Sequence, residues 1–195
     1  IFNNAYMMTG SHHLYNYLPT KHEKWLTMIK QEIIDSGLIV DILNAKTMED
    51  VFRLLQGCSF LGSFLAYQYT IDMNYSPYIN FSENDFVKAG IGAIRGIKKC
   101  FLCYGNKCED AIWYVKEHFN DLQKRYGYTS FHPLLGHEPT LIDLQNCFCE
   151  TDKYLRAKMP ELRIGNVRIK QKYMPHTDPI QFFFPPKWNI VEMYK

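Results

Sequence analysis

The stretch LLQGCSFLGSFLAYQYTIDMN, residues 54–74, decides the expected fold. It reads as the end of one helix, a tight turn from Gly57 to Gly62, and a second helix from Ser63 to Asn74 that is apolar on nearly all sides. A helix with so little polar surface is expected at the centre of a domain. The amides at the start of the second helix point outward and are able to hold a phosphate, although an ordinary corner between two helices explains the same stretch equally well.

Further helices are expected on both sides of this pair. Thr20 and Thr47 each open a capping box, and Gly37 and Gly57 supply the matching stops. Helical periodicity continues after the Ser76-Pro77 break. The expected helices are 21–36, 47–57, 63–74, a short one capped by Ser82 and running through Val87, 92–104, 107–125 and 140–157. The fold class is therefore expected to be all-α.

The last 35 residues differ in character from the helical part. Residues 162–169 alternate around Gly165-Asn166, which predicts a small β-hairpin. The prolines that follow, together with Phe182 to Phe184, indicate an extended tail laid over the helices. We therefore expect a helical domain over residues 1–160 and a hairpin with a Pro/aromatic tail over residues 161–195.

Composition excludes several classes of protein. With 22 Lys+Arg against 20 Asp+Glu and 47% hydrophobic residues, the chain is neither disordered nor collagen-like, and we expect a soluble globular protein. No apolar run approaches the roughly 18 residues of a membrane span, so no membrane association is expected. No secretory signal is visible, and we expect an intracellular protein, in the nucleus or in the cytoplasm of a bacterial or phage-infected cell, with reduced cysteines. The first residue is Ile1, and we expect a segment of a longer polypeptide.

Motifs for metal or nucleotide binding are weak. Cys100, Cys103 and Cys108 give one C-x2-C-x4-C run with no second C-x-x-C pair, so no metal site is expected. The GIGAIRG run at residues 90–96 lacks the lysine and hydroxyl of a P-loop, so no kinase activity is expected from this segment. We expect no cofactor.

Basic residues gather in two places. Residues 150–172 hold seven Lys/Arg against three Asp/Glu, and a second group follows the glycine-rich run. Such clusters are commonly solvated faces, but two of them around a helical core raise the expectation of phosphate contacts. The candidate phosphate ligands are Gly62, Lys88, Arg95, Lys98 and Lys99.

Two aspartates are candidates for catalysis. Asp85 lies among apolar residues just past a loop, where partial desolvation would let its carboxylate serve as a base or stabilise positive charge. A helix N-terminal acid favoured by the macrodipole is an equally good interpretation. Asp72 interrupts an apolar helix, and a structural ion pair explains it slightly better than catalysis does.

Aromatic and amide side chains surround these aspartates. Recognition of a base outside a duplex needs stacking faces and amides that read base edges. Tyr67 and Tyr69 are candidates for stacking, and Gln68 and Asn84 for edge reading, although most such rings simply belong to the core.

Two blocks of the sequence carry a family resemblance. They are FLGSFLAYQYTIDMNYSPYINFSENDFVKAGIGAIRGIKKCF, residues 60–101, and LIDLQNCFCETDKYLR, residues 141–156. They resemble the helical domain of 5-hydroxymethyluracil DNA kinases, a group also described as alpha-glutamyl/putrescinyl-thymine pyrophosphorylases, which is similar to helix-hairpin-helix DNA glycosylases. The resemblance covers about residues 20–157.

The resemblance implies a protein that binds, or acts on, a modified thymine in DNA. Asp85 matches the glycosylase aspartate that stabilises a cationic sugar. In the hypermodification enzymes the implied reaction is displacement of pyrophosphate from an activated 5-hydroxymethyl group by an amine or amino acid, and Asp85 fits that reaction too. Where the glycosylase hairpin reads Gly-x-Gly, this chain reads Phe60-Leu61-Gly62, and Phe64 replaces the lysine of lyase-type enzymes, so no Schiff-base chemistry is expected.

Two hypotheses about function follow. The first is a helix-hairpin-helix, glycosylase-like enzyme that flips a modified pyrimidine out of DNA, then substitutes at its 5-methylene group or cleaves its glycosidic bond. It implies an amine or amino-acid co-substrate and a kinase module on another chain or segment. The second is a catalytically silent helical module that binds nucleic acid or anchors a larger assembly.

Overall fold

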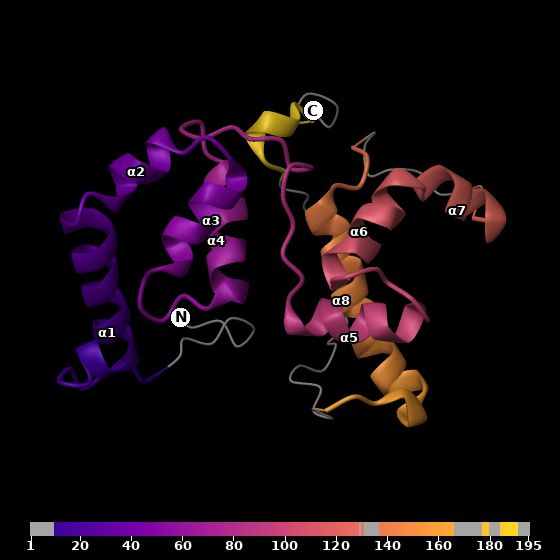
Figure 1. Cartoon of the computed structure of the whole chain (residues 1–195), viewed down its shortest axis with the longest axis horizontal. Coiled ribbons are helices and arrows are strands. Elements are labelled where there is room, and N and C mark those ends of the chain that lie inside the picture. The colour runs from indigo at the N-terminus through magenta and orange to yellow at the C-terminus, as the bar shows by residue number, and fades with distance from the viewer. Residues whose placement is uncertain (1–9, 129, 131–136, 166–176, 180–183, 191–195) are drawn as a thin grey trace. The chain divides into compact units, whose positions relative to one another are not determined.

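The computed structural model describes residues 10–128, 130, 137–165, 177–179 and 184–190, and every regular element in these ranges is helical (Figure 1). The expected all-α class is confirmed for this part of the chain. The chain divides into two compact units. The N-terminal unit comprises Ile1–Phe81 with Ile169–Thr177, and the C-terminal unit comprises Ser82–Arg168 with Asp178–Lys195. Each is described by itself.

The N-terminal unit contains all the helices expected before residue 75, plus one that was not predicted. In chain order its elements are the 3₁₀ turn η1 (His13–Tyr15), α1 (Lys21–Met28), the π-helical segment η2 (Ile29–Asp35), α2 (Leu38–Asn44), α3 (Met48–Gln56) and α4 (Ser63–Asn74). The unpredicted helix is α2. It starts directly after Gly37, whose φ of 84° ends η2, so this glycine separates two helices where only a stop was expected.

Both predicted capping boxes are present. The Thr20 hydroxyl accepts a hydrogen bond from the Glu23 amide, and the Glu23 carboxylate accepts one from the Thr20 amide at 3.1 Å. Thr47 and Asp50 make the same reciprocal pair, with both hydrogen bonds 3.0 Å long. Each box satisfies helix-end amides that the helix itself leaves without partners, and so fixes the first residue of α1 and of α3.

The core of the N-terminal unit lies between α3 and α4. Met48, Val51 and Leu55 of α3 are each at most 1% exposed, and α4 contributes Ala66, Tyr67 and Ile71 to the same core. The side chain of Asn74, at the end of α4, hydrogen-bonds to the backbone of Phe81 through both its oxygen (2.8 Å) and its nitrogen (3.1 Å). These two hydrogen bonds fix the loop that follows α4.

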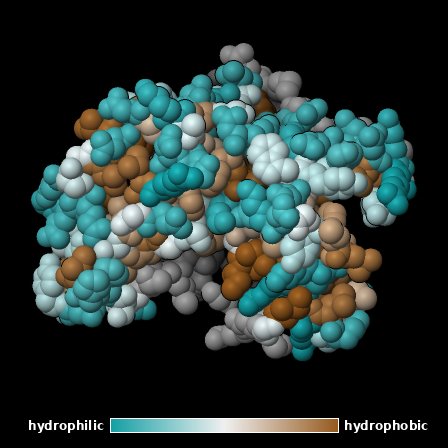
Figure 2. All heavy atoms as spheres, in the orientation of Figure 1, coloured by the Kyte–Doolittle hydropathy of each residue, from teal (hydrophilic) through white to brown (hydrophobic). Residues whose placement is uncertain are grey.

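Apolar side chains also reach the surface of this unit. Ile39, Val40 and Leu43 of α2 are exposed, as are Leu26 of α1 and Ile34 of η2. Figure 2 shows apolar atoms gathered over the α2 region.

The C-terminal unit is built on a pair of packed helices. Its elements are α5 (Ile91–Cys100), α6 (Cys108–Glu117), α7 (Phe119–Arg125), α8 (Leu141–Lys158) and the 3₁₀ turns η3 (Pro160–Leu162) and η4 (Pro186–Trp188). The helix expected over 92–104 ends at Cys100, because Phe101 is extended. The helix expected over 107–125 is broken at His118, whose φ of −108° and ψ of 18° are not helical.

The short helix expected from Ser82 to Val87 is wrong. Ser82 opens a turn in which the Asp85 amide donates to the Ser82 carbonyl and the Asn84 amide donates to the Ser82 hydroxyl. The chain then runs extended, and the buried Glu109 of α6 accepts from the Ala89 amide at 3.1 Å. A serine that initiates a turn and a serine that caps a helix make the same local bonds, and here the extended path against α6 prevails.

Glycines allow α5 and α8 to pack closely (Figure 1). A Cβ on Gly96 would overlap the carbonyl oxygen of Phe148 and lie 2.8 Å from its carbonyl carbon, and a Cβ on Gly92 would overlap the Cys149 sulfur. The glycines of the GIGAIRG run therefore serve close contact between helices.

A buried charge cluster lies between the same helices. Lys99 of α5 and Asp152 of α8 form an ion pair at 2.6 Å, and each side chain is only 2% exposed. Asp152 is also 3.1 Å from the Arg156 guanidinium.

Several expectations about the C-terminal region lie outside the described residues. Residues 166–169 of the predicted hairpin and Phe182 and Phe183 of the predicted tail are among them, so the hairpin and the boundary near residue 160 stay predictions. Within the described ranges, none of the helices combines the length and the apolar character that a membrane span requires.

Candidate functional site

The turn between α3 and α4 borders an open cleft in the N-terminal unit. The cleft has a volume of about 540 Å³ and lies between residues 57–62 and the segment Ser11–Leu14. The N-cap residue of α4 is Gly62, which is exposed and has no side chain that could cap the helix. The first amides of α4 have no partners within the helix, so this edge of the cleft is suited to an anion.

Phe60 gives the turn its shape. Its φ is 65°, a left-handed conformation that costs a residue other than glycine of order 1–3 kcal/mol. The Phe60 ring stacks on Trp25 at 5.5 Å between centroids, lies 5.5 Å from the Tyr15 ring and meets the His12 ring edge-on at 5.3 Å. These ring contacts offset the strain and anchor Phe60 in the turn.

Glu32 of η2 holds the same turn through hydrogen bonds. Its carboxylate accepts hydrogen bonds from the Ser59 amide and from the Tyr15 hydroxyl, both at 2.6 Å. Burial alone would raise the pKa of Glu32, but the two hydrogen bonds outweigh it and hold this pKa below its usual value. Burial and the neighbouring carboxylate raise the pKa of Tyr15. Glu32 is therefore ionised at neutral pH and ties the turn to η1.

The predicted site residues of α4 differ in accessibility. Tyr67 is 1% exposed and belongs to the core, which leaves no ring face for a base to stack on. Tyr69 and Gln68 are half-buried, and the side-chain nitrogen of Gln68 donates to no other described residue. Asp72 is exposed, yet the protein atoms around it raise its pKa, and burial with the nearby Asp72 charge raises the pKa of Tyr69.

The turn at residues 82–85 holds the other predicted carboxylate. Asp85 is exposed, so the partial desolvation expected for it is not seen. Glu83 is the buried acid of this turn: it is 8% exposed and accepts from the Trp188 indole nitrogen at 2.7 Å. Sequence reasoning missed Glu83 because its partner lies 105 residues further along the chain. No local pattern indicates such a contact.

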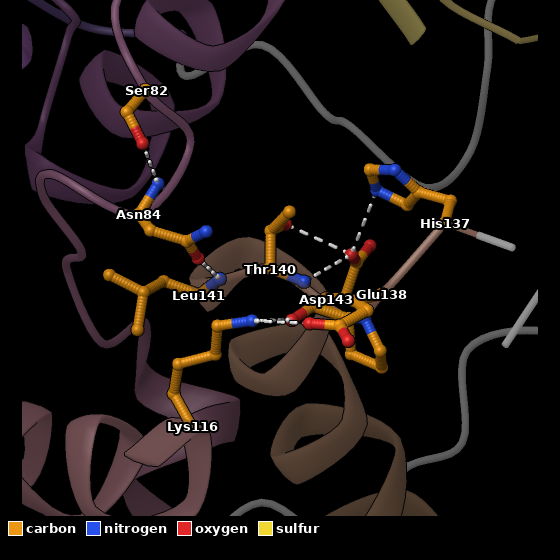
Figure 3. A network of polar contacts seen from close by, with 9 residues as sticks. Ser82, Asn84, Lys116, His137, Glu138, Thr140, Leu141 and Asp143 are labelled. Carbon is orange, nitrogen blue, oxygen red and sulfur yellow. Dashed lines mark hydrogen bonds and ion pairs between the residues drawn. The ribbon is translucent and has the colours of Figure 1, made fainter.

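Asn84 supports the start of α8. Its side-chain oxygen accepts from the Leu141 amide at 3.2 Å, as Figure 3 shows. Thr140 and Asp143 complete the cap, with the Thr140 amide donating to Asp143 at 2.8 Å. The side-chain oxygen of Asn84 therefore has a structural role, and no other described residue hydrogen-bonds to its side-chain nitrogen.

The predicted phosphate ligands of the C-terminal unit are not equivalent. Lys98 is exposed, and none of the described acids pairs with it. Lys88 pairs with the buried Glu109 at 2.8 Å, and Lys99 is buried against Asp152. Of the lysines, Lys98 is therefore best placed to meet a phosphate. The fourth cation, Arg95, is half-buried.

The predicted constellation is divided between the two units. Gly62, Tyr67, Gln68, Tyr69 and Asp72 belong to the N-terminal unit, and the remaining predicted residues belong to the C-terminal unit. Their assembly into one site stays a prediction. Over the residues that the structure describes, His, Cys, Asp and Glu side chains do not form a group of three suited to a metal ion.

Comparison with known proteins identifies the family of this chain. Neither the curated proteins nor the solved structures gave a match. The family described as "5-hmdU DNA kinase, helical domain" matches residues 1–164, most of the chain and all of the helices α1 to α8. This chain belongs to the family of 5-hmdU DNA kinase helical domains.

Proposed function

We propose that this chain binds DNA and acts on a modified thymine that is flipped out of the duplex. Family membership supports a role in DNA modification and a DNA substrate. The segment that comprises α3, the turn and α4, residues 48–74, borders an open cleft, and no side chain caps the start of α4. These features support a phosphate-binding hairpin of the helix-hairpin-helix type. The proposal depends most on this hairpin.

The DNA backbone would be held by amides and cations. The first amides of α4, next to Gly62, suit one phosphate, and the exposed Lys98 suits another. Contacts of this kind position a duplex without reading its sequence, so affinity should fall steeply with salt.

The flipped base would meet the residues that remain accessible. Two candidates lie in separate units: Tyr69 of the N-terminal unit offers a stacking face, and Asn84 of the C-terminal unit offers its side-chain nitrogen, whereas the Gln68 nitrogen is buried. Extruding a base costs a few kcal/mol, least where the base is already modified or unpaired, and such contacts offset that cost.

The exposed carboxylate of Asp85 would serve the reaction. In a substitution, the bond between the 5-methylene carbon and the leaving pyrophosphate oxygen breaks, and pyrophosphate departs with the electron pair. A C–N bond forms to an amine or amino acid, whose proton passes to the carboxylate. Glycosidic cleavage would instead place the carboxylate beside a cationic sugar. Asp72, whose pKa is raised, is the second candidate for accepting a proton.

The substitution implies partners. An activated 5-hydroxymethyl group requires a kinase, which would lie on another chain or segment, and an amine donor. We place these reactions inside the cell.

The test is a nucleoside analysis. The protein is incubated, with and without an amine donor, with DNA that contains 5-hydroxymethyluracil, its pyrophosphorylated form or plain thymine, and the nucleosides are measured by mass spectrometry. We expect a changed nucleoside from a modified DNA only, and its loss in Asp85→Asn. Unchanged nucleosides together with salt-dependent DNA binding would instead identify a catalytically silent binding module, which the exposure of Asp85 would explain.

A further inference from the structure

A second pocket lies within the C-terminal unit, apart from the hairpin. It has a volume of about 160 Å³ and is lined by Lys116, Glu117, Phe119, Asn120, Gln123 and the segment 138–139. All of these residues belong to the C-terminal unit. Nothing in the site described above uses it.

One wall of the pocket is fixed by the start of α8. The Lys116 ammonium donates to the Pro139 carbonyl at 2.8 Å and lies 3.9 Å from the Glu138 carboxylate. Directly after Pro139, Thr140 is held by Asp143 through its amide and its hydroxyl (Figure 3). The Lys116 ammonium is therefore already engaged by the Pro139 carbonyl and the Glu138 carboxylate of the pocket lining.

Other lining residues lie at and just after the break between α6 and α7. His118 stacks on Tyr114 at 4.4 Å and contacts the Tyr114 carbonyl at 2.9 Å, which holds the break in place. Asn120 and Gln123 follow on α7, three residues apart and so on one face of the helix. Neither side-chain amide hydrogen-bonds to another described residue, and both line the pocket.

The lining indicates the chemistry of a ligand. Two carboxylates, Glu117 and Glu138, accompany one lysine that is already engaged, so a phosphate or another anion would be repelled. Two side-chain amides offer donors and acceptors together, as the edge of a nucleobase requires, and an aromatic ring forms part of the lining. The volume admits one six-membered ring with its substituents and is small compared with ordinary ligand pockets of about 300–1,000 Å³.

We propose that this pocket binds a single uncharged pyrimidine base, with Asn120 and Gln123 reading its edge. The inference rests on the proposed function, because it assigns a place to the pyrimidine which that function requires. It adds Asn120 and Gln123 of α7 to the residues that are proposed to contact the base.

Titration of the intact chain with free nucleosides tests the pocket. Thymidine and 5-hydroxymethyl-2′-deoxyuridine are the pyrimidine probes, adenosine is the larger base, and thymidine 5′-monophosphate is the anion. Binding is followed by NMR shifts of the Asn and Gln side-chain amides. We expect both pyrimidine nucleosides to bind more tightly than adenosine or the monophosphate.

Matched variants locate the binding. Loss of one neutral hydrogen bond corresponds to roughly a 2- to 12-fold weaker affinity, which we expect for Asn120→Ala and for Gln123→Ala. Gln123→Glu keeps the shape but removes the N–H donors and should weaken binding as well. Asn146→Ala, at an exposed asparagine of α8 away from the pocket, should bind as the wild type does. Circular dichroism confirms that each variant is folded.

The outcomes separate this inference from the proposed function. Wild-type affinity in Asn120→Ala and Gln123→Ala, tighter binding of adenosine, or no nucleoside binding at all would overturn the pyrimidine pocket, even if modified DNA is processed. Conversely, pyrimidine binding that these variants weaken, combined with unchanged DNA nucleosides, would support the pocket and refute the reaction.

Discussion

Replacement of Gly96 by alanine tests the packing on which the C-terminal unit depends. The new Cβ would overlap the carbonyl oxygen of Phe148 and lie 2.8 Å from its carbonyl carbon. Both are backbone atoms, so no side chain is able to rotate away. The methyl group fits only if α5 and α8 separate along a contact that buries Ala93, Ile97 and Leu144.

The expected cost follows from two opposing contributions. Alanine favours a helix over glycine by about 1 kcal/mol, which stabilises the variant. Overpacking a well-packed contact costs about 1–3 kcal/mol and occasionally more, and an overlap with backbone belongs at the upper end. We therefore expect the C-terminal unit of Gly96→Ala to lose at least about 2 kcal/mol of unfolding free energy.

Native-state hydrogen exchange of the α5 and α8 amides measures this loss for the unit concerned. Gly92→Ala is the internal comparison: its Cβ meets the Cys149 side chain, which is able to move, so its loss should be smaller. Protection in Gly96→Ala equal to or above that of the wild type would refute the close contact of α5 with Phe148.

Three further predictions concern charged groups. Asp152→Asn should lower the unfolding free energy by about 3–5 kcal/mol, because it leaves Lys99 buried without its counter-charge; a loss below 1 kcal/mol in denaturant titrations would contradict that pairing. The hydrogen bonds that keep the Glu32 pKa low add stability above its ordinary value of 4.5, and this stability is lost as the pH falls through the lowered value. Glu32→Gln should therefore melt at a lower temperature at pH 7 and lose less on acidification, and an acid profile parallel to that of the wild type would argue against the Glu32 tie. Lys98→Gln should reduce the slope of log affinity for DNA against log salt by about 1, whereas an unchanged slope would place Lys98 away from the phosphates.

Local signals predicted much of the helical content. The boxes at Thr20 and Thr47 specify helix starts through bonds that span three residues, and both were confirmed. The same reasoning failed at Ser82, because the choice between a turn and a helix there is made by Glu109, which holds the Ala89 amide from α6. A motif that involves only neighbouring residues is predictable to the extent that no distant group competes.

The candidate site was less predictable, because burial and pairing are properties of the folded chain. Asp85 and Glu83 stand two residues apart and look alike in the sequence, yet only Glu83 is covered and bonded to Trp188. Lys98 and Lys99 are neighbours, yet one is exposed and the other is buried against Asp152. Which member of each pair faces solvent depends on helix contacts that composition and spacing do not reveal.

The left-handed Phe60 bears on how a turn of this shape is detected in a sequence. A search pattern that insists on glycine at that position would pass over any chain in which an aromatic residue has replaced it. In this protein the left-handed Phe60 is accommodated by the rings of Tyr15 and Trp25, which come far earlier in the sequence. We expect chains that keep this left-handed turn to carry an aromatic residue there together with two aromatic residues about 35 to 45 positions upstream.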